Sequence, residues 1–399
     1  MKKLSSKTLL PLLAVATLAP NAFAESTAGN DVTNALAKSK VNIALRGRYE
    51  GVNQDGKEDA QAFTLKSRLT VTSGAYNGIS VGVELDNNSV LDDSYNDLTS
   101  SYSGNQAVVA DPEYTEVNQA YVKFTNDKFS LKAGRQRINH DGQRFVGGVG
   151  WRQNEQTYDG YRFQYKATDK LNFDYTYVYN VNRIFAADSK KADNLGGNIQ
   201  LANVAFKLNK QNKVSGFAYI LDFDNAAALS SSTYGIAYNG NFGAVKVNAS
   251  YATQSDNADN PNDFSADYYS IDAGTKIGSV NVKAGVEVLG SDNGVGFATP
   301  LATLHKFNGF ADIFLGTPAN GLEDIYVTAV TKVKGVKLVA TYHDFSSDVG
   351  SVDYGTELDL VAAYKVNKHY SLLAKYANYS ADSFSVDTDK LWLMVTAKF

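Results

Sequence analysis

The chain has no cysteine, six prolines and two methionines among its 399 residues. The lack of cysteine excludes disulfide bridges, cysteine-ligated metals and thiol chemistry. After the N-terminal segment, no apolar run approaches the roughly 20 residues that a transmembrane helix requires. Arginine is absent after residue 183, so all nine arginines lie in the first part of the chain. The formal net charge of −4 argues against nucleic acid as a partner.

The first 24 residues have the pattern of a secretory signal peptide. Three lysines precede the apolar run Leu9–Ala19, and Ala22-Phe23-Ala24 gives the small-x-small pattern of a cleavage site. Cleavage there removes the three lysines, which changes the net charge from −4 to −7. We expect residues 25–40 to form a short periplasmic segment with a helix around Ala35.

Apolar and polar residues alternate in short segments from residue 41 almost to the C-terminus. In 63–71, for example, apolar residues at 63, 65, 69 and 71 alternate with polar ones. A period of two predicts β-strands, and segments of about ten residues match tilted membrane strands. The 25 tyrosines, 20 phenylalanines and 32 glycines are also typical of outer-membrane barrels. The pattern predicts an all-β fold, a transmembrane antiparallel β-barrel over residues 41–399 with about 18 strands and 16 as the alternative.

The expected connections alternate in length. Tight turns follow even-numbered segments, and longer loops follow odd-numbered ones, notably 88–114, 138–154, 255–266 and 291–322. This wiring is typical of outer-membrane barrels, and an even strand count puts both termini on the periplasmic side. After the first three segments, strands are expected to start near Thr115, Lys128, Glu155, Lys170, Asn198, Lys213, Ser232, Gly243, Asp267, Ser279, Glu323, Gly335, Thr356, His369 and Asp389.

The chain ends in Phe399, after a segment whose apolar residues share one face. A terminal phenylalanine in this setting resembles the C-terminal signal that outer-membrane assembly machinery recognises. We therefore expect this machinery as a partner, together with outer-membrane lipid and lipopolysaccharide.

The stretch 134–159, GRQRINHDGQRFVGGVGWRQNEQTYD, contains four of the nine arginines and a glycine run. We expect its part Ile138–Asn154 to fold into the barrel lumen, with Ser291–Leu322 as a second inward loop. Arginine binds carboxylates as a planar fork, so an anionic solute fits such a lumen. Inward acids such as Glu84 and Asp86 leave open the alternative of a balanced, general diffusion pore. The expected pore-lining residues are Arg46, Arg48, Lys66, Arg68, Lys123, Lys132, Arg135, Arg144, Arg152, Arg162 and Lys166.

Residues for catalysis are sparse. Of the four histidines, none has a serine placed by a motif to form a nucleophilic pair. The acidic loop 255–267 lacks the carboxylate spacing of a calcium loop. We therefore expect no enzymatic activity, no cofactor and no metal site.

Several segments resemble the alginate-export family of outer-membrane barrels. They are LRGRYEGVNQDG with TLKSRLTV, the 134–159 stretch, HKFNGFADIFLGTPANGLEDIYV, and TYHDFSSD with YGTELDL, spread from Leu45 to Leu360. The resemblance implies an eighteen-stranded barrel with an arginine-rich pore that conducts an acidic polysaccharide. By resemblance, the positions where the family keeps basic residues are Arg46, Arg48, Arg68, Arg135, Arg144, Arg152 and Arg162.

This chain departs from the dedicated exporter because its second half has no arginine. We therefore expect a porin-like channel for small or oligomeric hydrophilic anions, such as acidic saccharides. The alternatives are a closed barrel that serves as an adhesin or receptor, and a soluble secreted enzyme.

Overall fold

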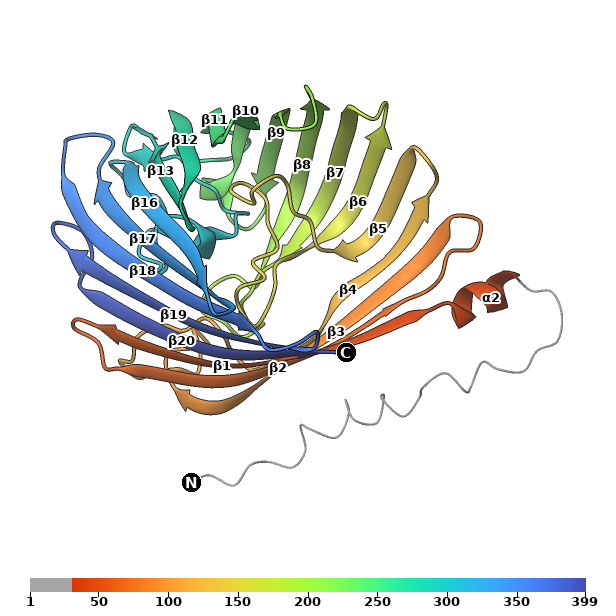
Figure 1. Cartoon of the computed structure of the whole chain (residues 1–399), viewed down its shortest axis with the longest axis horizontal. Helices are drawn as coiled ribbons and strands as arrows, with labels where there is room; N and C mark the ends of the chain where they lie inside the picture. The colour runs from red at the N-terminus through yellow and green to blue at the C-terminus, as the bar shows by residue number, and fades with distance from the viewer. Residues whose placement is uncertain (1–30) are drawn as a thin grey trace.

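The computed structural model describes residues 31–399, and the expected signal peptide lies outside them. A short helix, α2 (Asp31–Ala37), precedes the first strand. It lies outside the barrel (Figure 1), where the Ala35 carbonyl accepts a 3.0 Å hydrogen bond from the Gly74 N–H. The helix expected around Ala35 is therefore present. No helix within residues 31–399 is long and apolar enough to cross a membrane.

Eighteen antiparallel strands form one closed sheet, which confirms the larger of the two predicted strand counts. Each strand pairs with its neighbours in sequence, and the last pairs with the first to close the barrel (Figure 1). The strands are β1 (Lys40–Gln54), β2 (Ala60–Thr72), β3 (Ile79–Ser94), β4 (Tyr114–Thr125), β5 (Phe129–Gln136), β6 (Thr157–Lys166), β7 (Leu171–Asn182), β8 (Asn194–Lys207), β9 (Lys213–Phe223), β10 (Ser231–Phe242), β11 (Val245–Asp256), β12 (Ser265–Ile277), β13 (Val280–Leu289), β16 (Leu322–Val333), β17 (Val336–Ser346), β18 (Asp353–Lys365), β19 (Tyr370–Ala381) and β20 (Thr388–Lys398).

The alternating sequence pattern separates a lipid face from a lumen face. In β20, Leu391, Leu393 and Val395 point outward and are 41%, 48% and 52% exposed, whereas Trp392 between them is fully buried. An apolar outer band of this kind matches the hydrocarbon of a bilayer. The inner face carries the polar and charged side chains.

The connections follow the predicted alternation in length. Those on one side are short turns at 73–78, 126–128, 167–170, 208–212, 243–244, 278–279, 334–335 and 366–369. Those on the other side include long loops at 95–113, 137–156 and 290–321, although 55–59, 347–352 and 382–387 are no longer than the longest turn, 73–78. We call the two ends of the barrel the short-turn side and the long-loop side.

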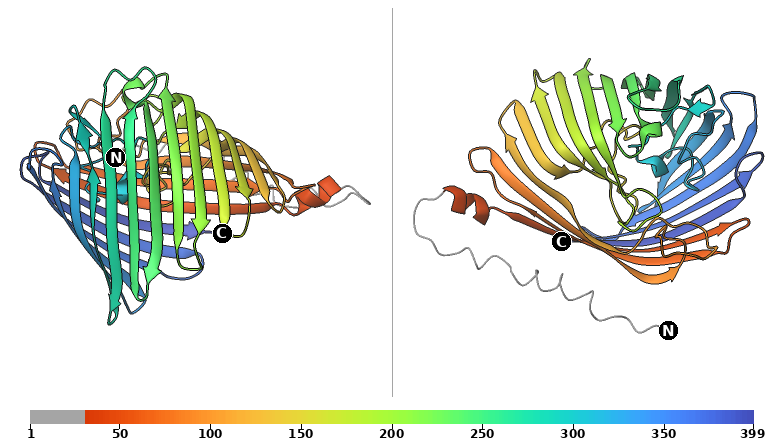
Figure 2. Two further views of the ribbon diagram at one scale, coloured as in Figure 1. Left: turned by 90° about the horizontal axis from the view of Figure 1, so that it is seen from above. Right: turned by 180° about the vertical axis from the view of Figure 1, so that it is seen from behind.

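Two long loops fold into the space enclosed by the strands, as the sequence predicts. Figures 1 and 2 show the loop 137–156 after β5 and the loop 290–321 after β13 inside the barrel. The second loop carries a small hairpin, β14 (Ser291–Asp292) with β15 (Val295–Gly296), and a 3-10 turn, η3 (Leu304–Lys306). Ile138, Phe297 and Leu301 are fully buried where the loops meet the wall. The core therefore lies inside the barrel.

Candidate solute pathway

The two inward loops bind each other and divide the lumen. The Gly147 N–H donates to the Leu301 carbonyl (2.8 Å), and the Thr303 N–H donates to the Gln143 carbonyl (3.1 Å). A Cβ on Gly147 would lie 2.2 Å from Thr303 Oγ1, so this close approach requires glycine. We call the joined loops 137–156 and 290–321 the partition.

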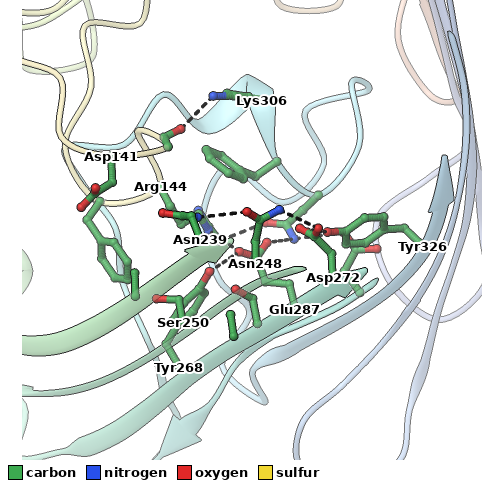
Figure 3. A pocket seen from close by; sticks show the side chains of 18 of the residues that line it. Asp141, Arg144, Asn239, Asn248, Ser250, Tyr268, Asp272, Glu287, Lys306 and Tyr326 are labelled. Atoms are coloured by element: carbon green, nitrogen blue, oxygen red, sulfur yellow. Dashed lines mark hydrogen bonds and ion pairs between the residues drawn. The ribbon is translucent and has the colours of Figure 1, made fainter. Parts of the chain in front are cut away.

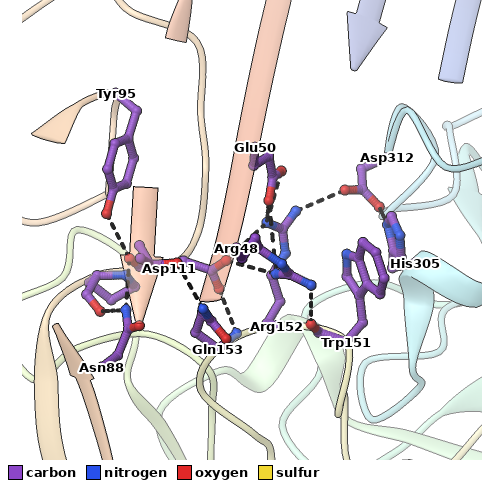
Figure 4. A network of polar contacts seen from close by, with 12 residues as sticks. Arg48, Glu50, Asn88, Tyr95, Asp111, Trp151, Arg152, Gln153, His305 and Asp312 are labelled. Atoms are coloured by element: carbon purple, nitrogen blue, oxygen red, sulfur yellow. Dashed lines mark hydrogen bonds and ion pairs between the residues drawn. The ribbon is translucent and has the colours of Figure 1, made fainter. Parts of the chain in front are cut away.

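A network of ion pairs fixes the partition to the wall formed by β1–β3 (Figure 4). Arg152 of the loop binds Glu50 of β1 (2.9 Å) and Asp312 of the second loop (2.9 Å). Arg48 of β1 binds Asp111 of the loop 95–113 (2.8 Å). The ion pairs form two clusters, each with equal numbers of cations and carboxylates. One contains Arg48, Arg152 and Lys390 with Glu50, Asp111 and Asp312. The other contains Lys66, Arg68 and Arg137 with Glu84, Asp86 and Glu155.

The pKa values of two loop carboxylates show how strongly these cations stabilise negative charge. Burial alone would raise the pKa of Asp111, but Arg48 and Arg152 hold it below its ordinary value. Likewise, Lys66, Arg68 and other cations overcome the effect of burial and hold the pKa of Glu155 far below its ordinary value. Both groups therefore stay ionised at neutral pH, and the arginine charge is largely neutralised where it is buried.

Arg46 has a different role from its neighbours on β1. Its guanidinium donates to Gln153 Oε1 (2.8 Å), to the Gly150 carbonyl (3.0 Å) and to the Arg152 carbonyl. It has no carboxylate within ion-pair distance among residues 31–399. Arg46 therefore holds the loop backbone to the wall.

Arg144 lies on the opposite side of the partition and lines a polar chamber (Figure 3). Its Nε donates to Glu287 of β13 (2.8 Å), and its two terminal nitrogens reach Thr299 and Asn308. The chamber has a volume of about 450 Å³ and lies towards the short-turn side. Its wall is rich in amide and hydroxyl groups, from Asn239, Asn248, Ser250, Ser270, Thr328 and Thr341. We call it the short-turn chamber.

The segment 304–312 separates the short-turn chamber from a second chamber on the long-loop side. Wall carboxylates hold it: Glu357 accepts from the Ala311 N–H (2.7 Å), and Asp359 accepts from the Phe310 N–H (3.1 Å). His305 lies between Asp312 (2.6 Å) and Lys375 of β19 (2.7 Å). The partition is thus bonded to β18 and β19 as well as to the neighbouring wall formed by β1–β3.

Three of the predicted lumen cations form a row across β4–β6. The strand register pairs Lys123 with Lys132 and Lys132 with Arg162. Arg162 binds Asp174 (2.5 Å), but Lys123 and Lys132 have no carboxylate within 4 Å in the described part of the chain. Lys166 lies at the short-turn rim, where it binds Asp169 (2.7 Å). This row is the least neutralised basic surface among the predicted residues.

Arg135 does not line the lumen, contrary to the prediction. The register pairs it with Ala120 and Asp159, on the same face as the exposed side chains of Leu131 and Tyr161. It binds Asp159 (2.9 Å) near the long-loop end of the outer surface. The reason is alternation: Lys132 points inward, so Arg135, three positions later, points outward.

Other lining residues were not among those predicted. Lys283 and Lys306 line the short-turn chamber, and Arg183 and Lys191 line the long-loop chamber. Arg183 and Lys191 lie in the loop 183–193, outside the alternating segments that revealed the other cations. Lys283 lies on β13, so the period of two could have predicted its inward direction. No group of three or more potential metal ligands occurs within residues 31–399.

Together these features define the class of the protein: an outer-membrane β-barrel of eighteen antiparallel strands. Residues 42–214 match the family model described as alginate export, which confirms the family resemblance over that part of the chain. No curated protein sequence matches the chain significantly.

Solved outer-membrane proteins have the same fold. OccAB4 of Acinetobacter baumannii is 14% identical with a TM-score of 0.71, and the match covers 90% of this chain and 98% of that one. The outer membrane protein OpdK of Pseudomonas aeruginosa is 15% identical with a TM-score of 0.70, covering 91% and 99%. OpdK has also been crystallised with vanillate, at 16% identity and a TM-score of 0.71 over 91% and 99%. The fold is that of porin-type barrels.

Proposed function

We propose that the protein is a passive outer-membrane channel for small or oligomeric hydrophilic anions, such as acidic saccharides. In this proposal the long loops face the outside, both termini face the periplasm, and solutes pass the partition between the two chambers. The observation that carries the proposal is the row Lys123–Lys132–Arg162 on the lumen wall. Like charges directly opposite each other destabilise a sheet, which favours a role that requires positive charge there.

The chemistry of the short-turn chamber supports the solute class. Amides and hydroxyls on its wall can exchange hydrogen bonds with a polyhydroxylated solute, and Lys283 and Lys306 supply positive charge for a carboxylate. Lys283 lies 3.7 Å from Asp272, a loose ion pair, and Lys306 has no carboxylate within 4 Å among residues 31–399. The buried arginines contribute less to selectivity than their number suggests, because carboxylates neutralise them.

The test is the reversal potential of single channels in a salt gradient. Wild-type protein should be anion-selective, because cations in a low-dielectric lumen concentrate anions. The double change Lys123→Gln/Lys132→Gln should shift the reversal potential towards cation selectivity and weaken block by oligouronates. Lys210→Gln/Lys368→Gln, in two short turns, is the matched control, since solvent screens charges beyond roughly 8 Å at physiological salt.

Lys213 would be a poor control, although it also lies near a short turn. Its amine binds Asp141 of the inward loop at 2.6 Å, so its loss would disturb the partition. A cation-selective wild-type channel, or one indifferent to the Lys123 and Lys132 changes, would refute the proposal. Refolded barrels without any conductance would support the alternative of a closed receptor or adhesin barrel.

A further inference from the structure

The second chamber lies on the long-loop side of the partition, and its composition differs from that of the first. It has a volume of about 520 Å³ and is enclosed by the ends of β1 and β20, the partition and the loops 95–113 and 183–193. We call it the long-loop chamber. Its size falls within the range of small-molecule sites. Such sites are mostly apolar, with a few polar groups that fix the orientation of the ligand.

The wall of the long-loop chamber is mainly aliphatic. Leu98 and Val108 come from one loop, Ile184 from a second, and Leu304, Ile313 and Leu315 from the partition. Val108 and Leu315 are 40% and 46% exposed. These side chains lie inside the barrel mouth, away from the lipid face, so neither membrane nor protein core accounts for their exposure. An apolar ligand would remove this surface from water.

A single guanidinium at the wall lacks a counter-ion. Arg183 lies 4.7 Å over the ring of Phe185, and its Nη1 donates to the Ala192 carbonyl (3.1 Å). No carboxylate lies within 4 Å of it in the part of the chain that the structure describes. By contrast, Arg152 and Lys390 on the same wall are both bound by Asp312. Burial lowers the pKa of Arg183, which is the effect expected of a cation that has lost water without gaining an anion.

We propose that the long-loop chamber binds an aliphatic monocarboxylate of medium chain length, with the carboxylate on Arg183 and the methylene chain against the aliphatic wall. A guanidinium with free N–H groups can hold a carboxylate through two parallel hydrogen bonds. A saccharide fits this wall less well, because most of the wall is apolar and would leave many of its hydroxyls buried without partners. An aromatic acid would lack a stacking partner, since Phe185 is the only aromatic carbocycle of the wall and Arg183 covers it.

This inference rests on the chamber itself and stands apart from the proposed conduction. Binding and current therefore give independent answers. A barrel that binds the carboxylate but passes no current would refute only the proposed channel. A conducting barrel that does not bind it would refute only this inference.

The experiment is calorimetric titration of the protein in lipid nanodiscs with hexanoate, octanoate and decanoate, each below its micellar concentration. Empty nanodiscs of the same lipid give the contribution from partitioning, which is subtracted. Each added CH2 should tighten binding about fourfold, the ratio that corresponds to ~0.8 kcal/mol per buried methylene. Glucuronate, benzoate and octanol should bind at least tenfold more weakly than octanoate.

Variants locate the site. Arg183→Gln should weaken octanoate binding at least tenfold, and Arg183→Lys should restore part of it. Leu315→Trp, which fills the chamber, should weaken decanoate more than hexanoate. Lys190→Gln is the matched control, because Lys190 lies in the same loop but its amine binds the Tyr102 carbonyl (2.6 Å). Folding of every variant is confirmed by its shift in unheated gel electrophoresis.

The inference fails if affinity is independent of chain length after subtraction. It also fails if glucuronate binds as tightly as octanoate, or if folded Arg183→Gln protein binds octanoate like the wild type.

Discussion

Trp151 shows how one loop side chain can contact several strands of the barrel wall. Its indole stacks on His305 with ring centroids 4.4 Å apart. The guanidinium of Arg48 on β1 and the amine of Lys375 on β19 each lie 4.3 Å from the indole centroid. Cation–π contacts are worth about 2 kcal/mol or more when they are desolvated. The loop 137–156 is therefore held to β1 and β19, which flank β20 in the sheet, through one residue.

Arg152→Ala should loosen the partition. The change leaves Glu50 and Asp312 buried with one cation fewer, and breaking a buried ion pair costs about 3–5 kcal/mol. We expect a lower urea midpoint, larger and noisier single-channel conductance, and a shift towards cation selectivity. Arg144→Ala should act similarly, because it removes the cation that pairs with the buried Glu287. Lys210→Ala is the control, and a folded Arg152→Ala channel with wild-type conductance would contradict this role.

His305 should make stability depend on pH. Burial lowers its pKa to about 3, with Asp312 opposing the effect and Lys375 adding to it. Nδ1–H then donates to Asp312, and Nε2 accepts from Lys375. The unfolded chain takes up a proton near pH 6.5, so stability is complete above that pH and falls as pH drops towards about 3.

Urea unfolding at pH 7.5 and pH 4.5 measures this dependence. The histidine contributes a loss of about 2–3 kcal/mol over this range, at 1.36 kcal/mol per pKa unit. His305→Gln should reduce the pH dependence by that amount. His369→Gln, in a short turn, should leave it unchanged. Equal pH dependence of wild type and His305→Gln would show that the histidine is protonated in the folded protein.

The strands could be predicted from the sequence because each strand has one face towards lipid and one towards the lumen. Apolar and polar residues therefore alternate along it with a period of two. Most predicted starts lie within two residues of the observed ones. The exceptions are Asn198, against an observed start at Asn194, and Thr356, against Asp353. Both lie where bulges shift the register, at Val178/Asn180 and Phe345/Ser346. A bulge places two residues against one, so alternation stops there.

The ion pairs of the partition could not be predicted in the same way. The inward direction of Arg48 and Arg68 follows from local alternation, and Arg68 binds Asp86 opposite it on β3, but their other partners, Asp111 and Glu155, come from loops. Arg48 and Asp111 are 63 residues apart, and Arg144 and Glu287 are 143 apart. Pattern alone cannot set such distances, because the loops have no period. The sequence therefore indicated, except for Arg135, which cations face inward and that wall acids such as Asp86 could balance them, but not that loop carboxylates such as Asp111 pair with them.

Gly134 lies near the end of β5, just before the chain turns into the lumen, and a substitution there tests whether the strand requires glycine at this position. Its φ is +117°, and a Cβ would lie 2.3 Å from the Ala120 carbonyl oxygen on β4. Gly134→Ala should strain the β4–β5 pairing just before the loop 137–156 and reduce the folded fraction. Unheated gel electrophoresis measures that fraction. Gly47→Ala on β1 is the matched control, since nothing lies within 4 Å of its Cβ position. Equal folded fractions would show that β5 tolerates a side chain there.

At the scale of the whole molecule, the orientation in the membrane is the main prediction. Epitope tags at Ser101, Ala258 and Asp382, all exposed on the long-loop side, should be reachable by antibody on intact cells. Tags within 209–212 or at Asn367, in short turns, should be reachable only after the outer membrane is permeabilised. Surface labelling at Asn367 would reverse the assignment of outside and periplasm, and with it the proposed sides of the two chambers.

The junction of β1 with β20 decides when the barrel can form. Phe399 exchanges two backbone hydrogen bonds with Ile43, at 3.0 and 2.9 Å, so the residues that complete the sheet are almost the whole chain apart. Every other pair of neighbouring strands is contiguous in sequence, whereas the second edge of β1, opposite the edge that pairs with β2, has no partner until β20 is available. Contacts of such long sequence separation form slowly. Until they form, two open sheet edges can recruit other chains. Loss of the last few residues should therefore produce aggregated or degraded protein even though the solute pathway is left intact.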